Sequence, residues 1–410
     1  MRLLIENIKT LVGIEEPGKP LLSGLAGSQM AHLSTLDEAW LLSEDGIIHS
    51  FGKMSDPPQE LRVDETINAK GRIVLPTWCD SHTHLVFAAP REQEFQDRIK
   101  GLSYAEIAAR GGGILNSAQK LNETSFDQLY EDALARLHQV IDLGTGAIEI
   151  KSGYGLSVEG EIKMLRVIKK LKEQAPIPIK ASFLAAHDFP PPYRENHQAY
   201  INLIIDTMLP IVADEGLADY MDVFCEQGFY SVPETAQLLE AGWKYGLKPK
   251  IHANQLHRSG GVQVGVQHNA ISVDHLESMG TEEIEALKGS NTIATLLPGA
   301  AFFLAMHYQP ARALIDAGLT VALATDFNPG SCPSGNMNFL LSLACTQLKM
   351  TPEEAINAQT INGAAAMELQ NHLGSIALGK KTSLIVTKPV PSVAYLPYSF
   401  GEDWIERVIV

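Results

Sequence analysis

The middle of this chain alternates between short apolar runs and longer amphipathic stretches, and this alternation restricts the possible folds more than any other feature. Eight runs have the composition of β-strands, and helical patterns separate most of them. The runs span residues 72–80, 147–152, 179–187, 220–226, 249–254, 270–275, 291–298 and 320–326. Strands that alternate with amphipathic helices form βαβ units around a parallel sheet. Eight such units across roughly 250–300 residues predict a (β/α)₈ barrel of the TIM type.

An open, doubly wound sheet is the alternative arrangement of such units. Its dinucleotide-binding form carries G-x-G-x-x-G directly after the first strand. The sequence after the run 72–80 lacks this motif. The closed barrel is therefore the favoured α/β architecture.

The two ends of the chain differ from the middle. Candidate strands near the start are interrupted by Gly, Pro and Asp, and they lie at Leu3–Ile8, Glu38–Leu42, Gly46–Gly52 and Thr66–Ala69. From about Gly374 onward, short apolar runs and prolines recur without a long helical pattern. We therefore predict a small β-sandwich domain built from residues 1–72 and 374–410, and a catalytic barrel over residues 73–373.

Charge and cysteine content disfavour several functional classes. The chain has 32 Lys and Arg against 48 Asp and Glu, a net charge of −16, whereas nucleic-acid binding requires a basic surface. It has no run of about 20 apolar residues of the kind that spans a membrane. Its four cysteines lie far apart without a C-x-x-C pair, which fits a reducing compartment. We expect a cytoplasmic protein with a small-molecule substrate, and neither a nucleic-acid nor a membrane partner.

Polar residues collect where the predicted strands end. Active sites of (β/α)₈ barrels lie at the C-terminal ends of the strands. Seven of the eight runs end in or beside a charged or metal-ligating residue, namely His82 and His84, Lys151, His187, Glu226, His252, His275 and Asp326. Because stability alone does not require such residues at one rim, the pattern predicts a functional site there.

Four of these residues have the chemistry of a metal site. In an extended segment, His82 and His84 point the same way. His252 adds a third nitrogen and Asp326 an oxygen, although each alone is an ordinary strand-end residue and Asp326 could cap a helix. Three nitrogens and one oxygen suit zinc or iron, with an open position for water. Such an ion lowers the pKa of its water to about 7.

Residues at the neighbouring strand ends suggest a general base for the metal-bound water and indicate how many metal ions the site holds. His275 is placed to act as the base, or to orient the water. A second metal needs a bridging ligand, often a carboxylated lysine on the fourth strand. The strand count puts Glu226 there and Lys151 on the second strand, so we predict one ion.

Several blocks of the sequence resemble the imidazolonepropionase family of the amidohydrolase superfamily. They are Ser81–Phe87, Arg91–Phe95, Gly111–Ile114, Lys151–Leu156 and Ala324–Gly330. The resemblance runs from about residue 70 to the C-terminal residue. It implies hydrolytic ring opening of 4-imidazolone-5-propanoate to N-formimidoyl-L-glutamate in histidine degradation, one zinc or iron ion per chain, a homodimer and a cytosolic location.

The resemblance also assigns residues. The family's metal ligands fall on His82, His84, His252 and Asp326. Its substrate contacts fall on Arg91, Tyr154, His187 and Gln255, and its substrate loop holds Asn328, Gly330 and Ser331. The chain departs from the family pattern at Gln255, at Ser331 and in the segment 379–384, which replaces a more usual acidic segment and is not expected to touch the chemistry. Gln255 stands where some members have a carboxylate, and an amide cannot shuttle a proton. Ser331 stands where threonine is more usual, and the hydroxyl is retained.

The expected roles follow from the chemistry of the implied substrate. Its propionate needs a cation, and Arg91 offers a bidentate fork. His187 is the expected hydrogen-bond donor to the developing oxyanion. The leaving nitrogen needs a proton, which either His275 or Asp326 could relay.

Two other functions compete with this one. The first is another cyclic-amide or deaminating amidohydrolase on the same metal site, but a deaminase of a neutral base needs no carboxylate clamp, so Arg91 and Tyr154 argue against it. A barrel that serves only as an interaction scaffold is expected to have lost at least one ligand. All four are present: His82, His84, His252 and Asp326.

Overall fold

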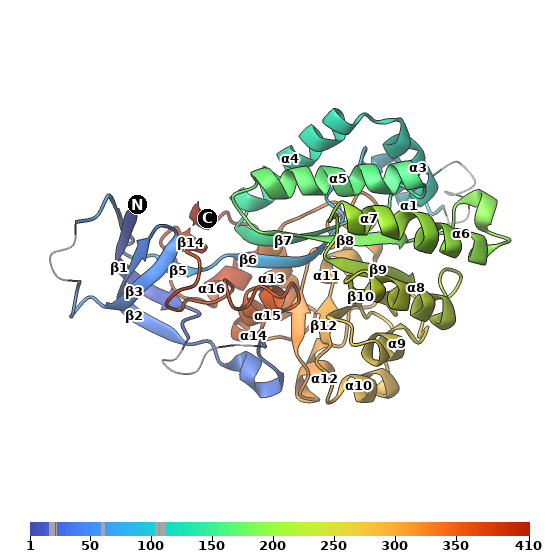
Figure 1. The fold of residues 1–410 in the computed structure, drawn as a ribbon. Helices are drawn as coiled ribbons and strands as arrows, with labels where there is room; N and C mark the ends of the chain where they lie inside the picture. The colour runs from blue at the N-terminus through green and yellow to red at the C-terminus, as the bar shows by residue number, and fades with distance from the viewer. Residues whose placement is uncertain (16–20, 22, 59–61, 103–105, 107–111) are drawn as a thin grey trace.

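The predicted alternation folds into a barrel with a separate small sheet at one end (Figure 1). The computed structural model describes residues 1–15, 21, 23–58, 62–102, 106 and 112–410. Eight parallel strands follow one another around the barrel in chain order. They are β6 (Trp78–Thr83), β7 (Thr145–Lys151), β8 (Ile179–Ala186), β9 (Tyr220–Cys225), β10 (Lys248–Ala253), β11 (Ser272–His275), β12 (Ile293–Leu296) and β13 (Val321–Leu323). The (β/α)₈ prediction and the strand count are confirmed.

The seam between the first and last strands closes through the segment that follows β13. The backbone N–H of Asp326 donates to the carbonyl of His82 at 3.0 Å, and that of His84 donates to the carbonyl of Phe327 at 2.9 Å. Thr83 and Phe327 form a parallel bridge. Barrel closure therefore brings Asp326 against the two histidines of β6.

Helices cover the outside of the barrel (Figure 1). The α-helices are α1 (Glu92–Ile99), α3 (Ile114–Glu123), α4 (Phe126–Asp142), α5 (Val158–Gln174), α6 (His197–Leu203), α7 (Leu209–Asp214), α8 (Val232–Lys244), α9 (Gly261–Gln267), α10 (Thr281–Leu287), α11 (Pro298–Leu304), α12 (Ala311–Asp316), α13 (Met337–Thr346), α14 (Pro352–Gln359), α15 (Ile361–Ala365) and α16 (Tyr395–Tyr398). Short turns of other helix types lie at Gly27–Ala31, Pro191–Tyr193 and Ile204–Met208. No helix among the described residues has the length and apolar character needed to cross a membrane.

Local sequence explains the longest helices. Ser125 and Ser157 cap α4 and α5, and each hydroxyl accepts a backbone N–H of the first turn. Each helix then buries one apolar face, with Leu137 of α4 and Leu165 of α5 both fully buried. These helices therefore pack their apolar faces against the barrel.

The connection between β6 and β7 is the long one expected at the first βα step. It contains α1, α3 and α4, and Arg91 lies immediately before α1. Of the glycine triplet 111–113, Gly111 lies outside the described residues. This connection brings Arg91 to the strand-end rim of the barrel.

The small domain predicted from both termini is present, and its seven strands are joined in one mixed sheet. The strands are β1 (Arg2–Val12), β2 (Thr35–Glu44), β3 (Ile47–Lys53), β4 (Glu65–Asn68), β5 (Ile73–Pro76), β14 (Leu384–Thr387) and β15 (Ile405–Ile409). Both ends of the chain lie on this side of the molecule (Figure 1). Its core combines Ile5, Leu41 and Val74 with Leu384 and Val386, all buried.

The run predicted as the first barrel strand, 72–80, is divided between the two sheets. Ile73–Pro76 pairs with β14 in the small sheet, and Trp78–Thr83 enters the barrel. Thr77 N–H still donates to Ser383 at 3.1 Å, whereas Trp78 N–H donates to Gly144 at 2.9 Å. The hydrogen-bond partner changes at this point, which divides the strand. The domain limits expected from the sequence stay a prediction.

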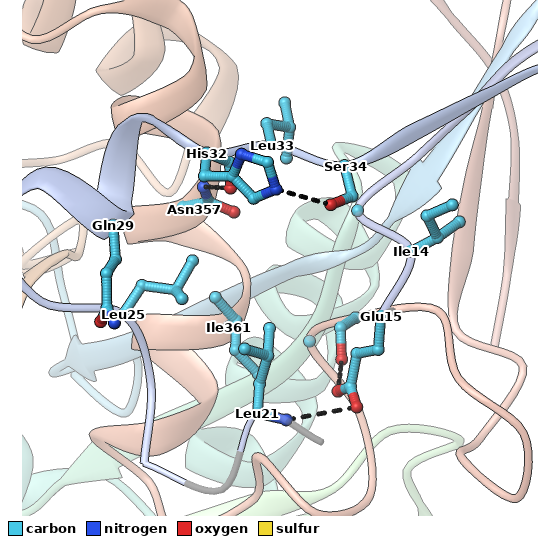
Figure 2. A pocket seen from close by; sticks show the side chains of 13 residues that line it. Ile14, Glu15, Leu21, Leu25, Gln29, His32, Leu33, Ser34, Asn357 and Ile361 are labelled. Carbon is cyan, nitrogen blue, oxygen red and sulfur yellow. Dashed lines mark hydrogen bonds between the residues drawn. The ribbon is translucent and has the colours of Figure 1, made fainter. Parts of the chain in front are cut away.

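A pocket of about 340 Å³ lies where the small sheet meets α14 and α15 (Figure 2). Apolar side chains such as Leu25 and Ile361 line it, together with Glu15. Glu15 accepts hydrogen bonds from Ser375 Oγ and Lys380 Nζ, both at 2.6 Å. None of the strand-end residues considered above lines this pocket, so it is distinct from the site at the rim.

Candidate active site

The four predicted metal ligands meet inside the C-terminal rim of the barrel. His252 Nε2 lies 3.3 Å from His84 Nε2, and Asp326 Oδ1 lies 3.6 Å from Nε2 of both His82 and His84. All four residues are buried. Ligand atoms 2.0–2.1 Å from a tetrahedral ion are about 3.3 Å apart. The spacing therefore fits a single metal ion.

Two carboxylates hold the ligand histidines from behind. His82 Nδ1 lies 2.6 Å from Asp274, and His252 Nδ1 lies 3.1 Å from Asp222. A carboxylate can only accept from these nitrogens, so Nδ1 carries the proton and Nε2 presents its lone pair. His82 Nε2 is buried and has no hydrogen-bond partner. Burial, with the charge of Lys151, lowers the pKa of His82 well below its usual value, which keeps the ring neutral as a ligand must be.

One lysine connects both carboxylates. Lys151 Nζ lies 2.7 Å from Asp222 Oδ2, 3.7 Å from Asp274 Oδ2 and 2.6 Å from Glu149 Oε1, and every member of this cluster is fully buried. Burial opposes the charge on Lys151, but the facing carboxylates of Asp222 and Glu149 raise its pKa above the usual value. Lys151 therefore fixes the groups that orient His82 and His252.

A second lysine completes this buried network. Lys250 Nζ pairs with Glu149 and donates to the Ser81 carbonyl at 3.1 Å, next to the first ligand. No role for Asp222, Asp274 or Lys250 was predicted from the sequence. The sequence pattern that could have identified these residues is a charged residue inside an otherwise apolar strand. Burying such a charge costs free energy unless it is paired.

Replacing Lys151 tests this network. Lys151→Met is expected to lower the free energy of unfolding by about 3–5 kcal/mol, because it leaves buried carboxylates unpaired. The metal affinity is expected to fall about 10- to 100-fold. Urea unfolding and competition with a chelator measure the two effects.

The matched control is Lys172→Met, because Lys172 pairs with Asp219 on the surface at 3.1 Å. It is expected to change neither property appreciably. A Lys151→Met protein as stable as the wild type contradicts the role of Lys151.

His275 lies beside the ligands on a strained turn. It ends β11 with a φ of 85°, and Leu276 follows with a φ of 66°, a left-handed conformation that costs about 1–2 kcal/mol per residue. Leu276 and Ser278 donate from their backbone N–H groups to the carbonyls of Ala253 and Asn254. Ligating atoms of His275, His82 and Asp326 lie within 4.8 Å of one another. The surrounding loops thus hold His275 at the metal site, in a conformation that the chain alone disfavours.

Arg91 approaches the site with a free donor. Its Nε donates to Ser117 at 2.8 Å, while its Nη2 is buried without a partner. A Cβ at Gly330 would lie 2.4 Å from Arg91 Nη1, so a larger residue there would displace the guanidinium. The Tyr154 ring centroid lies 5.7 Å from the guanidinium carbon. The structure brings these three predicted substrate residues together.

His187 packs against the metal ligands, and a backbone carbonyl fixes its tautomer. Its ring stacks on His84 with 5.2 Å between centroids, and Nδ1 lies 3.1 Å from the Gly153 carbonyl. A carbonyl can only accept, so Nδ1 carries the proton. Burial, with His252 nearby, lowers the pKa of His187 to about 3. A neutral ring of this tautomer presents an acceptor at Nε2, and the role of oxyanion donor expected from the sequence stays a prediction.

The loop after β13 is held by Asn328. Its Nδ2 donates to the Asp326 carbonyl and to Ser331 Oγ, both at 2.6 Å, and its Oδ1 accepts from the N–H groups of Gly330 and Ser331, both at 2.7 Å. Ser331 Oγ donates to Asp326 Oδ2 at 3.0 Å. The Asn328 amide therefore positions Ser331 and Asp326 within the loop, and its expected contact with substrate stays a prediction.

Gln255 lies in the loop after β10, and this loop is anchored by Glu226. The N–H groups of Leu256 and His257 donate to Glu226 Oε2 at 2.8 and 3.2 Å. Asn254 Nδ2 donates to the Ser278 carbonyl at 3.0 Å. Glu226, for which the sequence predicts no role, therefore positions the segment that carries Gln255.

Comparison with known sequences gives full-length relatives. An imidazolonepropionase of Flavobacterium johnsoniae is 58% identical over 407 residues, covering 99% of this chain and 98% of that protein. Another, of Christiangramia forsetii, is 55% identical over 410 residues, covering 100% and 99%. A third, of Streptococcus pyogenes serotype M3, is 38% identical over 408 residues, covering 99% and 96%. Residues 237–410 match the amidohydrolase family.

Solved structures of low sequence identity share the fold. A guanine deaminase of C. acetobutylicum superposes with a TM-score of 0.72 at 15% identity, covering 100% of this chain and 98% of that chain. An adenosine deaminase of Xanthomonas campestris with bound zinc gives a TM-score of 0.70 at 15% identity, covering 100% and 91%. These likenesses concern the fold alone, and they agree with the barrel described above.

Proposed function

The chain belongs to the imidazolonepropionase family of the amidohydrolases and is a hydrolase, and on this premise we propose that it opens the ring of 4-imidazolone-5-propanoate by hydrolysis. The product is N-formimidoyl-L-glutamate, and the reaction is a step of histidine degradation. The observation that carries the proposal is the unpartnered, buried Nη2 of Arg91 beside the histidine cluster, because it offers a carboxylate site next to a metal site.

The metal is zinc or iron, held by His82, His84, His252 and Asp326. When bound, it supplies a water of lowered pKa that serves as the nucleophile at neutral pH. The donor set supports this assignment, because three neutral imidazole nitrogens and one carboxylate oxygen suit either ion.

Arg91 binds the propionate of the substrate. The guanidinium fork suits a carboxylate, and burial strengthens the pair. The Tyr154 ring lies next to the Arg91 guanidinium, so the two side chains lie on the same side of the proposed substrate site. Gly330 lets the guanidinium approach the loop that Ser331 shares with Asp326. Arg91 thus provides the local positive charge that an anionic substrate needs in a chain of net charge −16.

His187 and Gln255 contact the ring. Neutral His187 offers Nε2 as an acceptor for a ring N–H. Gln255 offers an amide that can both donate and accept. Together the two side chains orient the ring carbonyl toward the nucleophile.

His275 moves the proton. It takes a proton from the attacking water and returns it to the leaving nitrogen as the carbon–nitrogen bond breaks. Asp326 is less suited to this task, because Oδ2 accepts from Ser331 and Oδ1 faces His82 and His84.

We also propose that the enzyme is a cytoplasmic homodimer.

Turnover of the substrate tests the function. The ultraviolet absorbance of freshly generated 4-imidazolone-5-propanoate is expected to fall rapidly with enzyme, to persist after chelation, and to fall again once zinc or iron is restored. A protein that carries one metal per chain and leaves the absorbance unchanged contradicts the substrate assignment. Such a result directs the search toward other cyclic amides.

A further inference from the structure

A buried carboxylate lies beside His275 without a role in the scheme above. Glu277 Oε1 is 3.6 Å from His275 Nδ1, an ion-pair distance that is too long for a hydrogen bond. The Nδ1 atom is buried and has no hydrogen-bond partner. The side chains of His275 and Glu277 are 3% and 2% exposed. Neither group can therefore rely on solvent to satisfy it.

The surroundings of Glu277 hold it toward His275. Gln309 Nε2 donates to Oε1 at 2.9 Å, whereas Oε2 is buried and has no partner. Burial raises the pKa of Glu277, the nearby Asp326 raises it further, and His275 opposes both effects. The 3.6 Å separation and the shared burial thus couple the two side chains.

Gln255 cannot take part in this coupling. Its side-chain amide neither gains nor loses a proton in water near neutral pH. The strained turn at His275 and Leu276 carries Glu277 on the same short segment as the proposed base. Glu277 is therefore the carboxylate that this segment supplies to His275.

We propose that Glu277 is the positioning residue of His275, acting on ring opening through Nδ1. This inference rests on the proposed function. A small rotation brings Oε1 into hydrogen-bond range of Nδ1–H, which fixes the tautomer and leaves Nε2 to react. Nε2 takes one proton of the attacking water, the water oxygen bonds to the ring carbonyl carbon, and the carbon–nitrogen bond breaks as Nε2 returns that proton to the nitrogen. Glu277 stays ionised throughout and balances the transient imidazolium.

Glu277→Gln, Glu277→Asp and Glu354→Gln, each loaded with zinc, test the proposal. Glu277→Gln keeps the shape and loses the charge, so kcat is expected to fall about 100-fold, with KM and metal content near wild type. Glu277→Asp keeps the charge and is expected to recover at least tenfold of that loss. Glu354 is a buried carboxylate that caps α14 and pairs with Arg312. Glu354→Gln shows the effect of losing a buried structural charge. Its kcat per folded, metal-loaded chain is expected to equal that of the wild type.

A double variant separates action through His275 from a general effect. If Glu277 acts through the ring, adding Glu277→Gln to His275→Gln lowers kcat no further. Three results overturn the proposal. The first is a near-wild-type kcat for Glu277→Gln, and the second is a Glu277→Gln protein in which only KM changes. The third is a double variant in which Glu277→Gln lowers kcat as much as it does in the wild-type background. If Glu277→Gln does not fold, Glu277→Asp decides, since a kcat no better than that of His275→Gln also overturns it. A wild-type enzyme that does not turn the substrate over refutes the proposed function itself, whatever the variants do.

Discussion

Removal of the metal is expected to abolish turnover and to lower the thermal stability of the protein together. Three histidines and Asp326 converge on one point inside the barrel, and a ligand that binds only the folded state stabilises it by mass action. After chelation we expect activity to fall at least 1,000-fold, about 4 kcal/mol in barrier height. Zinc or iron restores both properties to the wild type.

His252→Ala gives the same loss without recovery when metal is added. The variant lacks one of the four ligands, and Asp222 keeps Lys151 but loses its other partner, at 3.1 Å. His138→Ala, at an exposed position of α4, serves as the control and is expected to behave as the wild type. Metal analysis and calorimetry measure the outcome. Full activity of metal-free protein contradicts the site.

Arg91→Met is expected to cause the second large loss, in binding and not in metal content. Truncating one partner of a buried charged pair costs about 2–5 kcal/mol, so kcat/KM is expected to fall about 1,000-fold. An analogue whose propionate is replaced by an uncharged amide tests the cause. The wild type is expected to discriminate strongly against this analogue, whereas Arg91→Met treats the two compounds alike.

Arg166→Met is the matched control, because Arg166 pairs with Glu215 on the surface at 2.6 Å. It removes the same group from the chain without touching the rim. If Arg91→Met retains the preference for the carboxylate, the charge is recognised elsewhere and the assignment of Arg91 is wrong.

The sequence alone was sufficient for the barrel, the strand count and the four clustered ligands, for a physical reason. Apolar periodicity identifies the strands, and parallel strands must place their C-terminal ends on one rim. His82, His84, His252 and Asp326 were therefore placed together before any distance was known.

Other features depend on partners far away in the chain. The division of the run 72–80 depends on pairing with Ser383 and Gly144. The tautomer of His187 depends on the Gly153 carbonyl, and no pattern near His187 reveals it. Whether an amide such as Asn328 faces the substrate or its own loop is likewise decided by local hydrogen bonds that form only in the folded loop.

The buried charges were missed for a different reason. Lys151 and Glu226 stand at the ends of their apolar runs, whereas Asp222 and Asp274 lie within theirs, where a sequence pattern gives no sign of a function. Interior positions of a barrel strand alternate with exterior ones. A charged residue at an interior position thus has to find its partner across the barrel, which only the closed structure identifies.

The composite small sheet has a consequence for the order of folding during synthesis. Strand β5 hydrogen-bonds to β14, and Ile73 N–H donates to Thr387, 314 residues later in the chain. At about 5–20 residues per second, translation of the intervening chain takes about 15–60 s. The barrel strands therefore emerge from the ribosome while β5, already beside β1, still lacks its other neighbour, β14. The amino-terminal strands therefore expose a sheet edge until β14 and β15 have been synthesised and pair with it.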